Sequence, residues 1–361
     1  MAGPYTDHHV HFLATAAARL SVDVSSARSL AELAGMLGAA AGSGSGWMRA
    51  WGYEEWRLIE GRHPTREELD GMVPRRPVVL HHRTGHAAVL NSPALAEVGA
   101  AVDGDGLLVD RHDLLSRVPR LEPQALRAAA ATLSSEWEAA GVGSFVDATH
   151  TNGLGELDLF DQWRRSGELR QSVTAMIAPE AVAAGPLYGE QVGAVRIGAV
   201  KLMPGPGGAD RLEAQVVAAH GAGFPVAVHV VEIDVLEATL RALASSPSPA
   251  GTADRIEHNA LCLPEQVDAI AAVGATVVVN PSFLLHRRGK YEAELTPLER
   301  SWLIRMGSLL RAGVVVRAGS DSPVTPSRPD EMLAGAQAHP FQADESVSRS
   351  QAAAMLTAEL P

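Results

Sequence analysis

The hydrophobic positions fall into short, nearly continuous apolar runs that alternate with longer stretches rich in alanine and leucine. Runs of Val, Ile and Ala without regular polar alternation are typical of parallel strands covered on both faces. Eight such runs are present: 7–13, 143–149, 172–178, 195–203, 224–231, 254–260, 275–281 and 313–321. Helical patterns occupy 155–169, 210–222, 233–246, 263–275 and 298–313. Eight strands that alternate with helices predict an α/β fold, a (β/α)8 TIM barrel.

One interval breaks the regular spacing. Residues 14–142 separate the first strand from the second and hold a helical stretch, an aromatic segment and a histidine-rich segment. Without this interval about 230 residues are left, close to the ~250 of a bare barrel. We expect one barrel, 1–361, with 14–142 inserted after the first strand. Loops that follow barrel strands emerge at the C-terminal mouth, so the insertion is predicted to act as a lid or pocket wall.

Composition narrows the function classes. The chain has 42 acidic and 30 basic residues, a formal charge of −12, which disfavours nucleic-acid binding. No apolar stretch reaches the ~18 residues of a membrane span, and no membrane partner is expected. A single cysteine, Cys262, fits a reducing compartment, and the first residues resemble no secretory signal. We therefore expect a cytoplasmic protein with a small-molecule substrate.

The first apolar run carries polar side chains at alternate positions. Asp7, His9 and His11 are two residues apart, and such residues point to the same face of a strand. Two imidazoles at this spacing can chelate one ion, and a carboxylate behind them can fix their tautomers. A histidine-rich terminal tail without chemistry is the alternative.

Four more ionisable residues stand near the ends of other predicted strands. Lys201, His229, His258 and Asp321 close the fourth, fifth, sixth and eighth predicted strands. Each alone has an ordinary explanation, such as a hydrogen-bonded core histidine, a solvated lysine or a capping aspartate. Together they face one barrel mouth, where buried charges are costly without partners. With the two histidines of the first run they predict a metal centre.

This pattern resembles the amidohydrolase superfamily, which carries Asp-x-His-x-His on strand one, Lys on four, His on five and six and Asp on eight. The segments 46–56, 64–95, 255–259 and 319–324 resemble its amidohydrolase-3 branch more narrowly. That branch includes N-substituted formamide deformylase and related metal-dependent amide hydrolases. The resemblance extends from about residue 5 to residue 336.

The resemblance implies six metal ligands: His9, His11, Lys201, His229, His258 and Asp321. Lys201, carboxylated by CO2, would bridge two ions, and Asp321 would also carry protons. His258 is a candidate for stabilising the oxyanion as well. One or two zinc ions are expected from the nitrogen and oxygen donors, with Mn, Fe or Co left open.

The implied function is hydrolysis of a small-molecule C–N bond in an amide, formamide, carbamate or lactam. A metal-activated hydroxide would attack, with Asp321 as the proton shuttle. The alternatives are a deaminase, for which Lys201 is unexpected, a non-hydrolytic metal-dependent decarboxylase or isomerase, and a catalytically silent barrel. The silent barrel is disfavoured because every ligand position is filled.

Other residues are candidates for supporting roles. His82, Arg83, His86 and Asn91 in the insertion are predicted to bind substrate, against the alternative of a hydrogen-bonded turn that leads into a helix. Asp147, at the end of the second predicted strand, is expected to support the ligands from behind, as Asp7 is; a loop cap is its alternative.

Proteins of the superfamily commonly flank the barrel with a small β-sandwich. Here about 40 residues follow Asp321, and their pattern predicts one or two helices. We therefore expect no separate sandwich domain, and a homodimer partner is one way to cover the flank.

Overall fold

The computed structural model describes residues 5–42, 46–100, 104–204 and 208–357. The chain forms two compact units. The barrel unit comprises Met1–Phe12 and Ala131–Pro361, and the inserted unit comprises Leu13–Ala130.

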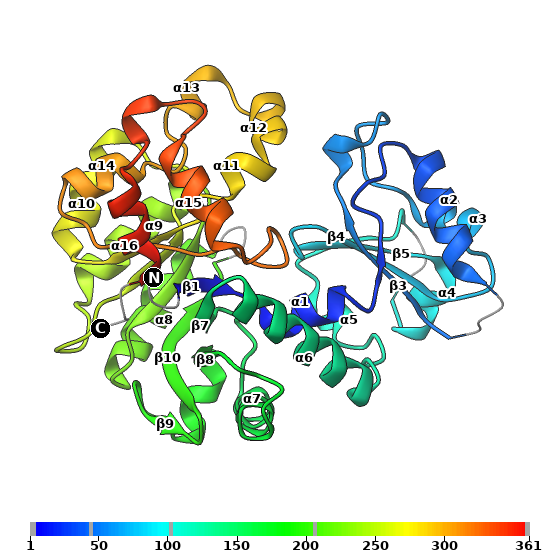
Figure 1. The fold of residues 1–361 in the computed structure, drawn as a ribbon, viewed down its shortest axis with the longest axis horizontal. Helices are drawn as coiled ribbons and strands as arrows, with labels where there is room; N and C mark the ends of the chain where they lie inside the picture. Colours follow the sequence, from blue (N-terminus) through cyan, green and yellow to red (C-terminus); the bar gives the residue numbers. More distant parts are fainter. Residues whose placement is uncertain (1–4, 43–45, 101–103, 205–207, 358–361) are drawn as a thin grey trace. The chain divides into compact units, whose positions relative to one another are not determined.

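The barrel unit is built on eight parallel strands (Figure 1). Their order in the sheet is β1 (Tyr5–Val10), β7 (Val142–Asp147), β8 (Ser172–Ile177), β10 (Val195–Leu202), β11 (Val226–Val230), β12 (Arg255–His258), β13 (Thr276–Val279) and β14 (Val316–Ala318). A short strand, β9 (Gln191–Val192), pairs antiparallel with β10. All eight predicted strands are present, which confirms the TIM-barrel fold.

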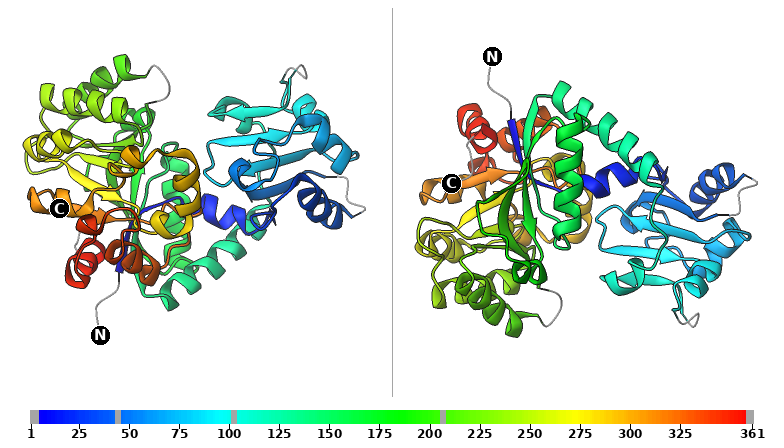
Figure 2. Two further views of the ribbon diagram at one scale, coloured as in Figure 1. Left: turned by 90° about the horizontal axis from the view of Figure 1, so that it is seen from above. Right: turned by 90° about the horizontal axis from the view of Figure 1, so that it is seen from below.

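Helices lie around the outside of these strands (Figures 1 and 2). They are α6 (Pro123–Ala139), α7 (Leu154–Ser166), η2 (Pro179–Ala184), α8 (Ala209–Gly221), α9 (Ile233–Ser245), α10 (Pro264–Val273), α11 (Phe283–His286), α12 (Arg288–Glu294), α13 (Pro297–Arg300), α14 (Met306–Arg311), α15 (Pro329–Gln337), η3 (Ala343–Glu345) and α16 (Arg349–Thr357). Glycine ends α7 and α10 in the left-handed conformation, at Gly167 and Gly274.

The prediction of one helix over 298–313 is wrong. The segment between α13 and α14 bonds instead to the loop after β12, where Cys262 N donates to Trp302 O at 2.9 Å and Ile304 N donates to Ala260 O at 2.9 Å. Ile304 has a φ of 42°, which no right-handed helix contains. Tertiary pairing therefore overrides the local helical pattern here.

The inserted unit is a five-stranded sheet covered on both faces. Its elements are α1 (Phe12–Ala18), β2 (Val22–Asp23), α2 (Leu30–Ala41), β3 (Met48–Tyr53), η1 (Glu55–Arg57), α3 (Arg66–Met72), β4 (Val78–His82), β5 (Ala87–Leu90), α4 (Ser92–Glu97), β6 (Leu107–Val109) and α5 (His112–Leu115). The strand order is β2-β3-β4-β5-β6. Val78 and Leu80 pack in one apolar cluster with α2 and α3, and Val79 packs in another with α4. Sequence patterns did not predict this sheet, and the lid role of 14–142 stays a prediction.

The barrel closes where β1 meets the end of β14. Val10 and Ser322 form a parallel bridge, His11 N donates to Ser322 O at 2.8 Å, and Asp321 N donates to His9 O at 2.7 Å. Gly319 allows this approach, because a Cβ on Gly319 would lie 2.5 Å from His9 Cβ and 2.6 Å from His9 N. Closure therefore places the two histidines of β1 beside Asp321.

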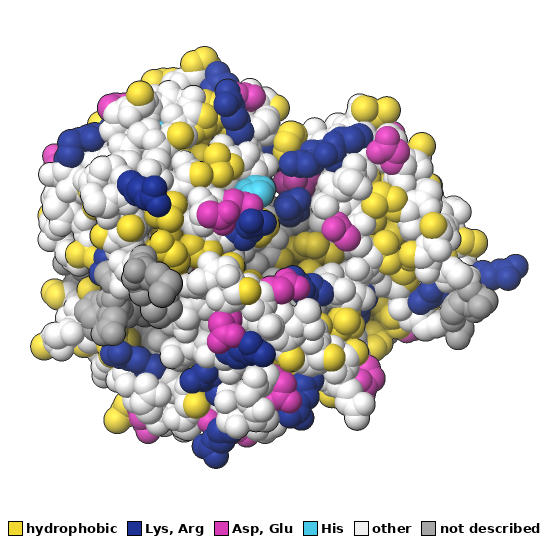
Figure 3. Space-filling view, in the orientation of Figure 1, with side chains coloured by type: hydrophobic (Ala, Val, Ile, Leu, Met, Phe, Trp, Pro, Cys, Tyr) yellow, Lys and Arg dark blue, Asp and Glu magenta, His cyan; other side chains and the backbone are white. Residues whose placement is uncertain are grey.

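Acidic and basic side chains are interspersed over the face drawn in Figure 3. Among the helices in the described ranges, none has both the length and the apolar character that crossing a bilayer requires.

Replacing Gly319 with alanine tests the closure. The added methyl group has to displace the β1 backbone, so we expect Gly319→Ala to lower the free energy of unfolding by about 1–3 kcal/mol, the usual cost of overpacking. Urea denaturation followed by circular dichroism measures this. Gly155→Ala in α7, where a Cβ would meet nothing within 4 Å, is the matched control and should unfold like the parent. Equal stability of the two variants would contradict the tight closure.

Candidate metal centre

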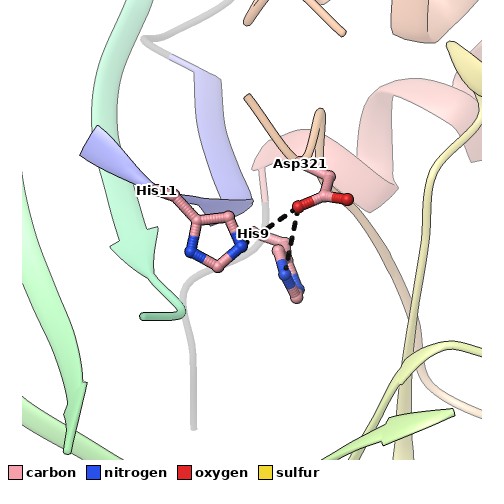
Figure 4. Close-up of side chains that lie close together, drawn as sticks. All are labelled: His9, His11 and Asp321. Atoms are coloured by element: carbon pink, nitrogen blue, oxygen red, sulfur yellow. Dashed lines mark ion pairs between the residues drawn. The ribbon is translucent and has the colours of Figure 1, made fainter. Parts of the chain in front are cut away.

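Three side chains converge at the C-terminal mouth of the barrel. His9 and His11 come from the end of β1, and Asp321 comes from the loop after β14 (Figure 4). Asp321 Oδ1 lies 3.2 Å from His11 Nε2 and 3.6 Å from His9 Nε2. Their donor atoms all lie within 4.8 Å of one another, and no other group of three His, Cys, Asp or Glu does so among the residues that the structure describes.

The other three predicted ligands end neighbouring strands. The ring of His258, at the end of β12, lies 4.6 Å from the ring of His9 and 4.6 Å from the ring of His229 on β11, measured between centroids. Lys201, on β10, is only 2% exposed, and its Nζ has no hydrogen-bond partner among the residues that the structure describes. Burial lowers the pKa of Lys201 to about 8, against the attraction of Glu257 and Asp321.

Three of these histidines are held through Nδ1. His9 Nδ1 lies 2.5 Å from Glu257 Oε2, and His258 Nδ1 lies 2.7 Å from the Oδ1 of Asn280, whose amide in turn donates to Gly319 O. His11 Nδ1 lies 3.1 Å from the hydroxyl of Thr149. Carboxylate and amide oxygens only accept, so the Nδ1 of both His9 and His258 carries the proton. The unprotonated Nε2 of each ring is then the nitrogen that can bind a metal ion.

The protonation states match those that a metal ion requires. Burial, with a smaller contribution from Lys201, lowers the pKa of His9 to about 3. Burial also lowers the pKa of His258. For Asp321 burial alone would raise the pKa, but the hydrogen bond from His11 and the neighbouring histidines bring it below its ordinary value. Neutral imidazoles and an ionised carboxylate are the forms that bind divalent ions.

The backbone is unusual at two of these positions. His258 and Asp321 have φ values of 68° and 57°. A left-handed conformation is uncommon for residues other than glycine and recurs at functional sites. The loops after β12 and β14 thus turn sharply where the candidate ligands stand.

The two carboxylates predicted to lie behind the ligands hold backbone segments. Asp147 accepts from Phe12 N at 2.8 Å and from Thr149 N at 3.1 Å. Asp7 accepts from Ser320 N at 2.9 Å and from the Ser327 hydroxyl at 2.6 Å. Burial raises the pKa of Asp7 to about 6, although these hydrogen bonds oppose the shift. Asp147 thereby supports the residue that bonds His11, and Asp7 supports the loop that carries Asp321.

Simple alternation along β1 predicts that Asp7 and His9 point to the same face and share partners. In the structure their partners differ. The pairing of β1 with β7 is irregular between Asp7 and Val10. The irregularity directs Asp7 to the loop after β14, whereas His9 contacts Glu257 on β12.

The candidates in the inserted unit have local partners. His82 lies 2.8 Å from Glu55 through Nε2, and His86 lies 2.8 Å from Asp110 through Nδ1. The backbone N of Arg83 donates to Tyr53 O at 3.0 Å. Substrate binding by His82, Arg83 and His86 stays a prediction.

Asn91 has a structural role. It is fully buried, and its Oδ1 accepts from Val78 N at 2.8 Å and from Ala94 N at 3.2 Å, which caps α4. Its Nδ2 donates to Arg76 O at 2.8 Å. These contacts match the alternative of a turn that leads into a helix, and substrate binding by Asn91 stays a prediction.

Sequence reasoning missed Glu257, Arg255, Asn280 and Thr149. Burial alone would raise the pKa of Glu257, but Arg255 and the hydrogen bond from His9 hold it well below its ordinary value. An acidic residue inside the apolar run 254–260 was the available signal for Glu257.

A cavity of about 530 Å³ lies at the ends of β7 and β8. Its lining includes His150, Leu154, Glu180 and Ala181. His150 directly follows Thr149, whose hydroxyl bonds His11. The cavity is thus lined by the residue that follows Thr149 in the sequence.

The donor set fits a divalent ion. His9 and His258 are neutral and offer Nε2, and Asp321 is ionised. The buried Nζ of Lys201 has no hydrogen-bond partner within the described ranges. Nitrogen and oxygen donors of this kind suit zinc and neighbouring first-row metals.

The model of the amidohydrolase family matches residues 1–359. The chain belongs to the amidohydrolase family. No curated protein matches it.

Two solved structures of similar fold are uncharacterized metal-dependent hydrolases. The protein from Pyrococcus furiosus has a TM-score of 0.72 and 22% identity, with 97% of this chain and 80% of that chain covered. The protein from Pyrococcus horikoshii OT3 has a TM-score of 0.76 and 20% identity, with 97% and 78% covered. At this identity the likeness shows the shared fold.

Added zinc should stabilise the protein. At a free zinc concentration about 100-fold above the dissociation constant, ligand linkage predicts that the free energy of unfolding rises by about 2.7 kcal/mol. Thermal denaturation of chelator-treated protein with and without zinc measures the change. His11→Ala should reduce the rise, whereas His286→Ala, which removes a ring paired with Glu331 at 2.6 Å, should retain it in full. An equal response of both variants would place the zinc elsewhere.

Proposed function

We propose that this member of the amidohydrolase family is a metal-dependent hydrolase of a small-molecule C–N bond in an amide, formamide, carbamate or lactam. The convergence of His9, His11 and Asp321 within 4.8 Å carries the proposal. Two further observations support it: the candidate ligands on β10, β11 and β12 adjoin this cluster, and the two Pyrococcus structures are described as metal-dependent hydrolases.

His9, His11 and Asp321 would hold one divalent ion, and Lys201, His229 and His258 would hold a second. Bound ions of this kind supply Lewis acidity, which lowers the pKa of water and polarises a carbonyl. Zinc suits these donors, and Mn, Fe and Co accept similar ones.

Asp321 is assigned the proton transfers. Its carboxylate is ionised, so it can accept the proton that the attacking water loses. Hydrolysis forms a C–O bond and breaks the C–N bond, and Asp321 returns the proton to the leaving nitrogen. His11 Nε2 lies 3.2 Å from Asp321 Oδ1, so the two atoms are close enough to contact the same ion.

Lys201 is assigned a second function. Its lowered pKa leaves more of the amine neutral, and a neutral amine adds to CO2 with loss of one proton to form a carbamate. Carboxylation would give Lys201 an anionic oxygen, a donor that divalent ions accept. The burial of Nζ, without a hydrogen-bond partner in the described part of the chain, supports this assignment.

Metal analysis of wild type, Lys201→Ala and Asp321→Ala tests the proposal. We expect near two equivalents of zinc in the wild type and fewer in Lys201→Ala. Wild type should release amine from a panel of N-formyl and N-acyl amines, whereas Asp321→Ala should lose at least 100-fold in kcat, since general acid–base catalysis contributes about 10²–10⁴-fold. One equivalent, unaffected by Lys201→Ala, would favour a mononuclear deaminase-like site. No metal after supply of zinc and bicarbonate would overturn the proposal.

The cavity at the ends of β7 and β8 is proposed to hold part of the substrate. Ala181 lines it from η2, and a larger side chain there would fill it. We expect Ala181→Phe to raise KM at least several-fold with the zinc content unchanged. Ala183→Phe, at an exposed position of the same short helix, is the matched control and should leave KM unaltered. Unchanged KM in both variants would place the substrate elsewhere. The cytoplasmic location and the homodimer stay predictions.

A further inference from the structure

Two side chains of β12 reach across the barrel interior to β1. In the sheet, β12 pairs with β11 and β13, whereas β1 pairs with β7 and closes on β14. The strands are therefore not neighbours. Even so, Glu257 Oε2 lies 2.5 Å from His9 Nδ1, and Arg255 Nη2 donates to His8 O at 2.8 Å. Glu257 and His9 are both 0% exposed.

The irregularity of β1 explains the contact with the backbone. The pairing of β1 with β7 shifts between Asp7 and Val10, and this interval contains His8. A buried carbonyl needs a hydrogen-bond donor, and the Arg255 guanidinium donates to His8 O. Arg255 thus holds the backbone directly before the first candidate ligand.

Arg255 also fixes the carboxylate of Glu257. Its Nε donates to Glu257 Oε1 at 2.6 Å and its Nη2 donates to Oε2 at 3.3 Å, while Oε2 also accepts from His9 Nδ1. The proton of the ring must then lie on Nδ1, and Nε2 points toward Asp321, 3.6 Å away. One ion pair thereby sets the tautomer and the orientation of His9.

A structural role alone does not account for this arrangement. Buried ion pairs are often no more stabilising than apolar residues of similar size. Carboxylates behind metal-binding histidines, by contrast, commonly raise metal affinity 10–100-fold.

We propose that Arg255 and Glu257 are a positioning pair for the metal centre, with Glu257 the residue that makes His9 a strong ligand. The pair acts through His9 and does not touch the reacting atoms. This inference rests on the proposed function, since it requires that His9 bind a metal ion.

Zinc affinity of the purified full-length protein, measured by competition with a chromophoric chelator, tests the pair. Glu257→Ala should weaken zinc binding roughly 10- to 100-fold. Glu257→Gln, which keeps an oxygen acceptor but loses the charge, should lose less. The matched control is Glu345→Gln, which alters another fully buried glutamate, bonded to Ser308 N at 2.8 Å and paired with Arg305 at 3.2 Å. It should bind zinc like the wild type.

A second readout follows the ring of His9 itself. In chelator-treated protein labelled with 15N-histidine, the signal absent from His9→Gln identifies His9 by NMR. That signal should report a proton on Nδ1 in the wild type and mixed tautomers in Glu257→Gln. Should Glu257→Ala fail to fold, Glu257→Gln alone decides, since it preserves the side-chain volume.

The outcomes distinguish failure of the proposed function from failure of the positioning pair. Wild-type protein that binds no zinc would refute the proposed function itself. Wild type that binds zinc, with Glu257→Gln of the same affinity and the same His9 tautomer, would overturn the positioning pair alone. An equal loss of affinity in the Glu345 control would do the same, because it would make the effect a general consequence of damaging the barrel.

Discussion

The close approach of β1 to the end of β14 is the constraint on which the site depends. The candidate ligands come from opposite ends of the sequence, and only the closed barrel brings His9 and His11 beside Asp321. Gly319 permits the approach because any side chain there would overlap His9. Backbone hydrogen bonds from Asp321 N to His9 O and from His11 N to Ser322 O then join the two ligand-bearing segments directly. Folding and assembly of the site are therefore one event.

Around this seam, the closure between β1 and the end of β14, buried polar groups form hydrogen bonds to the candidate ligands or to the loops that carry them. Asp7 bonds the loop that carries Asp321, Thr149 bonds His11, and Asn280 links His258 to the carbonyl of Gly319. The contacts direct Nε2 of the histidines inward, and burial keeps the rings of His9 and His258 neutral. The candidate ligands are thus ordered without a bound ion, which lowers the conformational entropy that binding a cation would cost.

Local patterns sufficed to predict the barrel, and they also marked the residues proposed as ligands. The buried strands are continuous apolar runs, and Lys201, His229 and His258 stand out because each interrupts such a run near its end. Tertiary features were beyond those patterns. The helix expected over 298–313 gives way to pairing with Ala260 and Cys262, and the link from Glu257 to His9 spans 248 positions. The strands of the inserted sheet lie among helical and aromatic signals, which concealed them.

The central claim is that the seam between β1 and β14 holds a metal ion, and anomalous X-ray diffraction at the zinc edge on crystals of the zinc-loaded protein tests it most directly. The account predicts a peak about 2.0–2.2 Å from Nε2 of His9, Nε2 of His11 and a carboxylate oxygen of Asp321, the usual zinc distances to such donors. Zinc bound in the crystal without a peak among these three residues would contradict it.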